Sequence, residues 1–335
     1  MSHAPDPRLV VHPAPFLHPQ VSTPRIMGDV LIALAPAFAA GVWFFGLSAL
    51  LVVLVSTAAC VATEWALSGR SQLRDLSAVV TGVLVGLILP PSLPLWMAAL
   101  GGFVSIALGK VAWGGMGHNL FNPALVGRAF LQAAFPIALT TWVPPQGPLA
   151  LYRGNLALPF LHGAPDAVTA ATPLGQMKFL AVSTPFLDLF WGNVSGSIGE
   201  TSAMALLLGG VYLLLRRAFD WRLPAGMLGA AALLAEVLHQ MHPEKYPGAL
   251  FTLLSGGLLI GAIFMASDPV TSPISPRGAW IFAVGAGVLV VLIRFWGGLP
   301  EGVMYAILLM NSASPLIDRA LQPRRFGARP VKEPR

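Results

Sequence analysis

The chain has 335 residues, of which 56% are apolar and 10% are charged, and its mean hydropathy is +0.73. Soluble domains contain about 25% charged residues, so the composition excludes a soluble globular protein and indicates a polytopic membrane protein. The formal net charge of +6 does not indicate a nucleic-acid partner, because the basic residues lie between apolar runs and in the C-terminal tail, as topology signals do.

The first 25 residues are rich in proline and histidine and contain no apolar core of the signal-peptide type. Ten apolar runs follow, each near the length of about 20 residues that a helix needs to cross a bilayer. They cover residues 26–45, 47–67, 76–90, 94–112, 124–142, 200–216, 223–240, 247–266, 279–296 and 300–318. The run at 76–90 is short and ends in Pro90-Pro91, which predicts a broken or tilted helix.

The lysine and arginine residues predict the orientation. If the N-terminus is cytoplasmic, 16 of the 20 lie inside, and only Arg153, Lys178, Lys245 and Arg294 lie outside. An even number of spans returns the C-terminus to the cytoplasm. We therefore predict a cytoplasmic arm at 1–25, a five-helix membrane half at 26–142, an external loop at 143–199, a second five-helix half at 200–318 and a basic cytoplasmic tail at 319–335.

The predicted fold is all-α, with about ten transmembrane helices and some broken or half helices. Because each half contains an odd number of spans, the two halves would have opposite orientations, as the inverted repeats of transporters have. The halves share no convincing sequence identity, so an inverted repeat is a hypothesis from span counting alone.

Two polar clusters interrupt the apolar pattern on the predicted inner side. Residues 117–124 precede the fifth span and are followed by Arg128, and residues 267–278 join the eighth span to the ninth. One interpretation is an ordinary pair of capped turns, in which Asn122 and Asp268 accept hydrogen bonds from free amides at helix ends. The other is a cofactor or ion pocket built from half-helix ends.

Three carboxylates fall inside or at the ends of apolar runs, where an ionised group is costly and often functional. Asp29 follows Arg25 by four residues, a spacing that suits a salt bridge on one helix, and Glu64 lies near the inner end of the second span. We predict that both are interfacial side chains that snorkel to water. Glu236 has no such explanation and is a candidate for the ion path.

Motifs of soluble enzymes are missing from the sequence. It contains no glycine-rich phosphate loop, no zinc-spaced His and Glu pair, no Cys-x-x-Cys and no nucleophile elbow. Cys60 is the single cysteine, so the thiolates of this chain predict no metal site. Any chemistry must therefore come from a bound cofactor or from partners.

The longest stretch without a helical pattern is the predicted external loop, which contains Asp-Ala-Val-Thr-Ala-Ala-Thr at residues 166–172. The small side chains around Thr172 would let a bulky reagent approach its hydroxyl, and Pro173 disfavours a helix through this position. Asp166 could orient a modifying enzyme. The residues alone leave open the alternative of an exposed polar loop without a function.

This heptad resembles the target of periplasmic flavin transferases, Asp-x-x-[Ser/Thr]-x-[Ala/Ser]-Thr. The resemblance implies that FMN is attached through its phosphate to Thr172, and that the transferase recognises Asp166, Thr169 and Ala171. Threonine at 169 in place of serine and alanine at 170 in place of glycine are mild departures from the usual heptad.

Five further blocks resemble the D subunit of the Rnf electron transport complex and its relative, the B subunit of the sodium-pumping NADH:quinone reductase. They are residues 23–27, 76–91, 121–124, 267–273 and 300–318, in the same order, and the resemblance covers nearly the whole chain. The reductase protein has a longer cytoplasmic extension before its spans. The short arm of this chain therefore favours the Rnf type over the reductase.

The resemblance implies a flavin-carrying subunit of a redox-driven ion pump in the bacterial inner membrane, which is not catalytic alone. Electrons would pass between ferredoxin and NAD while Na⁺ or H⁺ is moved. The implied partners are membrane subunits, iron–sulfur and second flavin-bearing subunits, the flavin transferase and membrane lipids. Thr172 would be an anchor rather than a catalyst.

The resemblance also implies a second, non-covalent flavin, riboflavin. Its pocket, or the ion path, is predicted from polar residues that face inward. These candidates are Ser77, Thr81, Asn122, Arg128, Asp268 and Thr271. Two alternatives of another class are a secondary transporter without a redox role and a scaffold subunit, which explain the spans but give the heptad no function.

Overall fold

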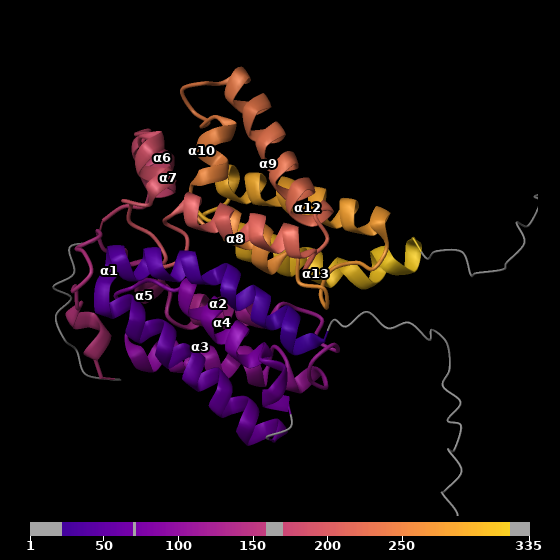
Figure 1. Ribbon diagram of the computed structural model, residues 1–335. Helices are drawn as coiled ribbons and strands as arrows, with labels where there is room; N and C mark the ends of the chain where they lie inside the picture. Colours follow the sequence, from indigo (N-terminus) through magenta and orange to yellow (C-terminus); the bar gives the residue numbers. More distant parts are fainter. Residues whose placement is uncertain (1–21, 70–71, 159–169, 322–335) are drawn as a thin grey trace, which may run out of the picture.

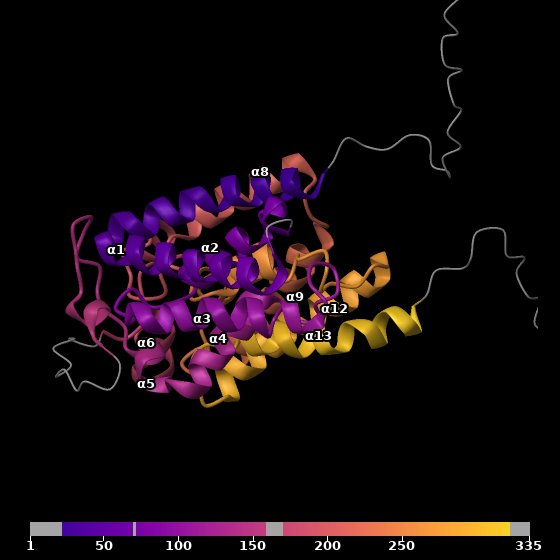
Figure 2. The ribbon, with the colours of Figure 1, turned by 90° about the horizontal axis from the view of Figure 1, so that it is seen from below.

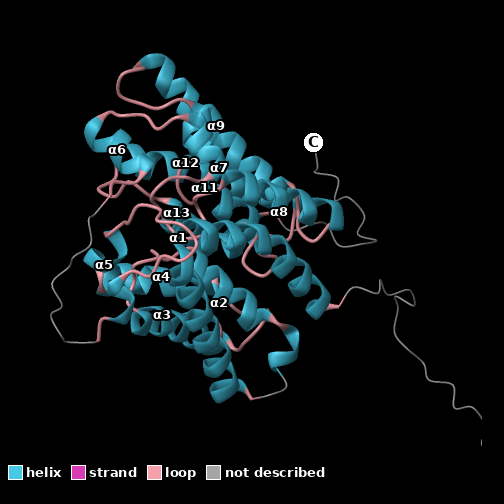
Figure 3. Ribbon diagram, turned by 60° about the vertical axis from the view of Figure 1, so that its left-hand side comes forward, coloured by secondary structure: helices cyan, strands magenta, loops and turns pink. Residues whose placement is uncertain are grey.

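The computed structural model describes residues 22–69, 72–158 and 170–321 (Figure 1). These residues form helices and loops without a strand, which confirms the all-α class (Figure 3). The helices of the first half are α1 (Thr23–Ser68), η1 (Gln72–Asp75), α2 (Ser77–Leu87), α3 (Leu95–Ala107), η2 (Val111–Trp113), α4 (Pro123–Ala134) and α5 (Pro136–Thr140). The loop that follows contains η3 (Arg153–Leu156), α6 (Pro173–Leu180) and α7 (Phe186–Trp191).

The second half contains α8 (Ala203–Arg216), α9 (Arg222–Met241), α10 (Ala249–Leu254), α11 (Leu258–Ile260), the π-helical turn η4 (Gly261–Met265), α12 (Pro276–Trp296) and α13 (Val303–Ala320). A helix therefore lies within each of the ten predicted apolar runs. Three stretches in the described part of the chain are long and apolar enough to cross a membrane, namely Thr23–Ser68, Leu95–Trp113 and Pro276–Trp296. The division of the chain into five regions stays a prediction.

Helix α1 is two helices joined at Gly46, where φ is 66° and ψ is −146°. Figures 1 and 2 show that the chain reverses its direction within α1, so α1 contains both of the first two predicted spans. Only glycine adopts this backbone conformation readily. The residues before and after Gly46 therefore form an antiparallel helical hairpin without a loop.

Two helices are interrupted inside the molecule. Helix α2 ends at Leu87, and the carbonyl of Leu87 accepts a hydrogen bond of 2.7 Å from the amide of Gly199. In the second half, α10 ends at Leu254, and Gly256, with φ of 64°, separates it from α11 and η4. The broken helices expected from the sequence are thus present, and each exposes backbone groups to the interior of the molecule.

Small residues bring the helices close together. A methyl group on Gly82 of α2 would lie 2.4 Å from Cα of Thr57 in α1, and one on Gly287 of α12 would lie 2.3 Å from the Met227 carbonyl of α9. Such contacts are typical of helices packed within a membrane, where close van der Waals contact replaces the hydrophobic effect. Figure 1 shows α1 to α5 on one side of the molecule and α9 to α13 on the other.

The described ends of the chain lie together. Figures 1 and 2 show that α1 begins and α13 ends at one end of the molecule, whereas α6 lies at the opposite end. We call these the terminal end and the loop end. Thr172, immediately before α6, therefore lies far from both described termini.

Candidate functional site

Thr172 is the N-cap of α6 at the loop end. Its Oγ1 accepts a hydrogen bond of 3.1 Å from the amide of Gly175, and Pro173 occupies the first helical position. Proline is favoured there because its missing N–H is not needed, so the helix begins directly after the threonine. Ala171 is exposed beside it. Asp166 and Thr169, the other predicted recognition residues, lie outside the described residues.

The half-buried hydroxyl of Thr172 lies on the wall of a cavity of about 560 Å³, which we call the outer cavity. Small-molecule sites usually measure about 300–1,000 Å³ and have apolar and aromatic walls with a few polar groups. The side chains that form this wall include Arg128, Trp142, Phe179, Glu301 and Tyr305. The size and lining of the outer cavity therefore fit a planar aromatic cofactor attached at Thr172.

Helix α6 is fixed to the membrane-embedded part by Lys178. Its Nζ donates hydrogen bonds to the carbonyls of Arg294, Gly297 and Leu299, at 2.8, 2.5 and 3.1 Å. These carbonyls belong to the last turn of α12 and the loop after it, where a cation also interacts favourably with the helix dipole. Burial lowers the pKa of Lys178. This lysine therefore holds the helix that begins at Thr172.

Leu174 attaches the N-terminal end of α6 to the broken helix of the second half. A methyl group on Gly256, in the break between α10 and α11, would lie 2.5 Å from Cδ1 of Leu174. The leucine side chain therefore occupies the space that the glycine leaves open. Together with Lys178, this contact places Thr172 directly over the broken helix.

A buried ion-pair cluster lies beside the outer cavity. Arg128 of α4 donates to Glu200 Oε1 at 2.8 Å and to Glu301 Oε2 at 2.9 Å. The carboxylate of Glu301 also accepts a hydrogen bond of 2.6 Å from the amide of Gly257. Arg128 comes from the first half, whereas both glutamates come from the second. The cluster therefore connects the two halves near Thr172.

Arg128 was predicted to lie with Asn122 among the inner residues, and the structure separates the two. Arg128 lies in the second turn of α4, and its guanidinium contacts residues that precede α8 and α13 at the loop end. It lines the outer cavity. Arg128 therefore does not belong to the inner-side charges that set the orientation.

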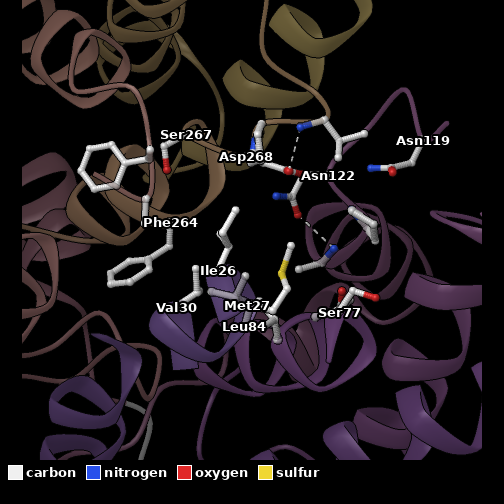
Figure 4. Close-up of a pocket in the computed structure, with 18 of the residues that line it drawn as sticks. Ile26, Met27, Val30, Ser77, Leu84, Asn119, Asn122, Phe264, Ser267 and Asp268 are labelled. Carbon is white, nitrogen blue, oxygen red and sulfur yellow. Dashed lines mark hydrogen bonds between the residues drawn. The ribbon is translucent and has the colours of Figure 1, made fainter. Parts of the chain in front are cut away.

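Four of the five other predicted pocket residues converge, and Thr271 is not among the residues that line their cavity. Ser77, Thr81, Asn122 and Asp268 line one cavity of about 100 Å³ toward the terminal end, which we call the inner cavity. Figure 4 shows Asn122 beside Asp268, with Ser77 across the space and apolar side chains such as Leu84 and Phe264 around it. Residues from α1, α2, α4, α8 and η4 and from the two polar loops thus meet at one place.

Asn122 and Asp268 both line the inner cavity and accept hydrogen bonds from nearby backbone amides. Asn122 Oδ1 accepts hydrogen bonds from the amides of Ala124 and Leu125, at 3.1 and 3.4 Å, and its Nδ2 donates to the Met265 carbonyl at 3.4 Å. The carboxylate of Asp268 accepts from the amide of Val270 at 3.1 Å and from the hydroxyl of Thr271 at 3.5 Å. Burial raises the pKa of Asp268 to about 6.

Glu64 differs from the prediction. It is fully buried and forms an ion pair with Lys110, which is 3% exposed and also donates to Ser77 Oγ. The prediction of a snorkelling interfacial side chain was wrong, because a lysine 46 positions away provides the counter-charge inside the molecule. Lys110 lines the inner cavity and was not among the predicted site residues.

The two remaining carboxylates have partners as well. Asp29 forms an ion pair of 3.2 Å with Arg216 of α8 and accepts a hydrogen bond of 2.9 Å from Tyr212, so this ion pair joins two helices. Glu236 accepts a hydrogen bond of 3.1 Å from the amide of Ala249 at the start of α10. The Glu236 carboxylate is therefore explained as a helix cap.

Glu200, Glu301 and Lys178 are site residues that were not predicted from the sequence. One signal could have revealed the two glutamates: each lies at the start of a predicted span, on the same side as the Thr172 loop, and Arg128 inside a span requires anionic partners. No comparable signal exists for Lys178, because its partners are carbonyls more than 100 positions away in the chain.

The comparisons with known proteins agree with this architecture. The model of the NQR2, RnfD, RnfE family matches residues 10–327. The D subunit of the ion-translocating oxidoreductase complex of Stutzerimonas stutzeri is 43% identical over 328 residues, which cover 91% of this chain and 92% of that protein. The D subunit of the proton-translocating ferredoxin:NAD(+) oxidoreductase complex of Clostridium ljungdahlii is 40% identical, with 94% and 95% covered.

The D subunit of the Na(+)-translocating ferredoxin:NAD(+) oxidoreductase complex of Acetobacterium woodii is 38% identical, with 97% of each chain covered. The similarity thus extends over both halves and the loop between them. It includes the residues that form the outer and inner cavities. The chain belongs to the NQR2, RnfD, RnfE family.

Proposed function

We propose that this chain is the flavin-carrying membrane subunit of an Rnf-type redox-driven ion pump, with FMN attached to Thr172 by a phosphoester bond. The observation that carries this proposal is the half-buried Thr172 hydroxyl on the wall of an aromatic-lined cavity of about 560 Å³. Neither a simple transporter nor a scaffold requires a modifiable hydroxyl at such a cavity.

The residues around Thr172 suit the two parts of the cofactor. A phosphate on Oγ1 would lie at the N-terminus of α6, where free amides and the helix dipole favour negative charge. The aromatic side chains of Trp142, Phe179 and Tyr305 would contact the planar ring and limit its access to water. When bound, FMN supplies one- and two-electron redox chemistry, and the protein supplies position and electrostatics.

The names of the relatives support the setting. Two of them are named for ferredoxin:NAD(+) oxidoreductase complexes, so we propose the same electron donor and acceptor for the complex of this chain. One name gives the proton and the other Na⁺ as the transported ion, at nearly equal identity. All three relatives are D subunits that match more than nine-tenths of this chain, which favours the Rnf type over the reductase.

We place the loop end on the external side of the bacterial inner membrane and both termini in the cytoplasm. The described termini lie at one end of the molecule and α6 at the other (Figures 1 and 2). When Arg128 is assigned to the external side, most of the lysine and arginine residues still lie on the predicted cytoplasmic side. In this orientation a flavin transferase outside the membrane would reach Thr172.

We infer that the inner cavity is a second binding site, for non-covalent riboflavin or for the transported ion. Its support is the convergence of Ser77, Thr81, Asn122 and Asp268. A volume of about 100 Å³ is below the range of about 300–1,000 Å³ for small-molecule sites, so a flavin ring would enter only if side chains moved. Acid extraction of the purified complex distinguishes the two ligands, because only riboflavin would appear in the extract.

The test of the tether is fluorescence of the denatured chain, made in cells that contain its flavin transferase. The wild type should be a fluorescent band in a denaturing gel, and Thr172→Ala should be dark. Thr140→Ala is the matched control, because Thr140 lines the same cavity while its hydroxyl donates only to carbonyls of its own helix turn. A dark wild-type band would overturn the proposal.

A further inference from the structure

Glu200 and Glu301 place two carboxylates close together beside the outer cavity. A methyl group on Gly257 would lie 2.7 Å from Glu200 Oε1 and 2.6 Å from Glu301 Oε1. Because these two distances share an end point, the oxygen atoms are no more than 5.3 Å apart. Two carboxylates at this separation, one buried and one partly buried, resist simultaneous ionisation, and the positive charge of Arg128 offsets the repulsion.

The two carboxylates are not equivalent. Glu301 accepts from two N–H donors, the guanidinium of Arg128 and the amide of Gly257, and its side chain is 19% exposed. Glu200 accepts from one N–H donor, the guanidinium of Arg128, and its side chain is 5% exposed. Hydrogen bonds to a carboxylate favour its ionised form, whereas burial disfavours it. Glu200 is therefore the member of the pair that binds a proton more readily.

Two buried hydroxyls near the ion-pair cluster lack a partner. Thr201 Oγ1, next to Glu200 in the chain, and Ser255 Oγ, next to Gly256, have no hydrogen-bond partner among the described residues. Buried hydroxyls almost always pair with protein or with water. Thr201 and Glu200 line a small cavity of about 30 Å³, which has room for water. A carboxylate beside such a cavity can exchange a proton with the solvent.

The same small cavity reaches Thr172. Its wall includes Thr172, Pro173 and Leu174 of the α6 N-terminus, together with Glu200 and Glu301. The charged groups that face Glu200 are Arg128 of α4, Glu301 before α13 and Arg294 of α12. With both glutamates ionised, these four side chains have no net charge. An added negative charge near Thr172 would therefore act on Glu200 without an excess of cations to screen it.

We propose that Glu200 is the proton acceptor coupled to reduction of the flavin at Thr172, an inference that rests on the proposed function. When a one-electron carrier in a partner protein passes one electron to the flavin, the Glu200 carboxylate forms one O–H bond with one proton from the aqueous phase at the loop end. When the electron leaves, that O–H bond breaks and the proton returns to water. Charge is thereby balanced near the buried cluster.

The experiment is a redox titration of the whole complex at several pH values, followed through the flavin absorbance that Thr172→Ala removes. Proton uptake on reduction makes the midpoint potential fall as pH rises. Glu200→Gln should reduce the slope of potential against pH, and Glu200→Asp should restore part of it. Glu236→Gln is the control and should retain the wild-type slope. Glu236 caps a helix and lines neither of the two cavities at the loop end.

Infrared difference spectra of the wild type provide a second readout that needs no variant to assemble. Reduction should produce a carbonyl band of a protonated carboxylic acid, and Glu200→Gln should lack it. A wild type without this band, or an unchanged slope in Glu200→Gln, overturns the proton role while the tether stands. If Thr172→Ala removes no flavin absorbance, the proposed function itself fails.

Discussion

Arg128 shows how one charged residue is tolerated within a helix that is otherwise uncharged. Its side chain is 9% exposed and contacts carboxylates of 5% and 19% exposure from the other half of the molecule. Removing one partner from such a buried pair usually costs roughly 3–5 kcal/mol, because the charges left behind are uncompensated. The stability of the assembled protein should therefore depend strongly on this arginine.

We predict that Arg128→Met lowers the midpoint of thermal unfolding of the detergent-solubilised complex by several degrees. Arg216→Met is the control, because the Arg216–Asp29 pair is partly exposed and such pairs contribute little. The midpoint is measured with a fluorescent unfolding dye that does not react with thiols, or by the loss of the intact complex on heating. Equal changes in the two variants would contradict a special role for the buried cluster.

At the residue scale, the sequence identified single residues better than their partners. Thr172 was selected by a motif of adjacent residues, and four of the six predicted pocket residues do meet in one cavity. Glu200 and Glu301 were missed because their common partner is 72 and 173 positions away. Arg128 was assigned to the wrong pocket for the same reason, since its place in a span does not show which end its side chain reaches.

At the element scale, Lys178 connects α6 to the end of α12. Three carbonyls accept hydrogen bonds from one ammonium group, so the loss of this group leaves all three without that donor. We predict that Lys178→Met increases hydrogen exchange in residues 173–180, while Lys178→Arg retains most of the protection. Lys245→Met is the control, because Lys245 is exposed and lies over Tyr246. Unchanged exchange in Lys178→Met would show that Leu174 alone holds the helix.

Gly46 determines whether α1 can form its hairpin. A methyl group there would lie 2.3 Å from the amide nitrogen of Ala150, and φ of 66° with ψ of −146° is strained for any other residue. We predict that Gly46→Ala greatly reduces the amount of protein in the membrane, as measured by immunoblot. Gly28→Ala in the same helix should accumulate normally, because no atom lies within 4 Å of the added methyl group.

The breaks in the helices were only partly predictable. Pro90-Pro91 indicated the end of α2, because proline lacks the donor that continues a helix. The break between α10 and α11 lies inside an apolar run in which Gly256 and Gly257 are the only local sign, and glycine is common within membrane helices. Its cause is tertiary: Leu174 and the carboxylate of Glu301 occupy the space beside these two glycines.

At the scale of the whole molecule, α6 lies at the loop end, whereas α1 begins and α13 ends at the terminal end (Figures 1 and 2). Both glutamates of the ion-pair cluster share a small cavity with Thr172 before α6, whereas the inner cavity is lined by residues at the start of α1. The two candidate cofactor sites are therefore at opposite ends of the same two helical halves. The proposed electron carrier at one end and the proposed ligand site at the other would suit a protein that couples two sides of a membrane. This arrangement makes the orientation in the membrane decisive for the function.

The orientation can be tested with single cysteines, because the native Cys60 is fully buried and should react poorly. Val182 is 53% exposed after α6, and Arg319 is exposed in the last turn of α13. In intact cells with a permeable outer envelope, a membrane-impermeant maleimide should label Val182→Cys and leave Arg319→Cys unlabelled. Arg319→Cys should react only after the inner membrane is opened. The reverse pattern would place Thr172 on the cytoplasmic side, where an external flavin transferase could not reach it.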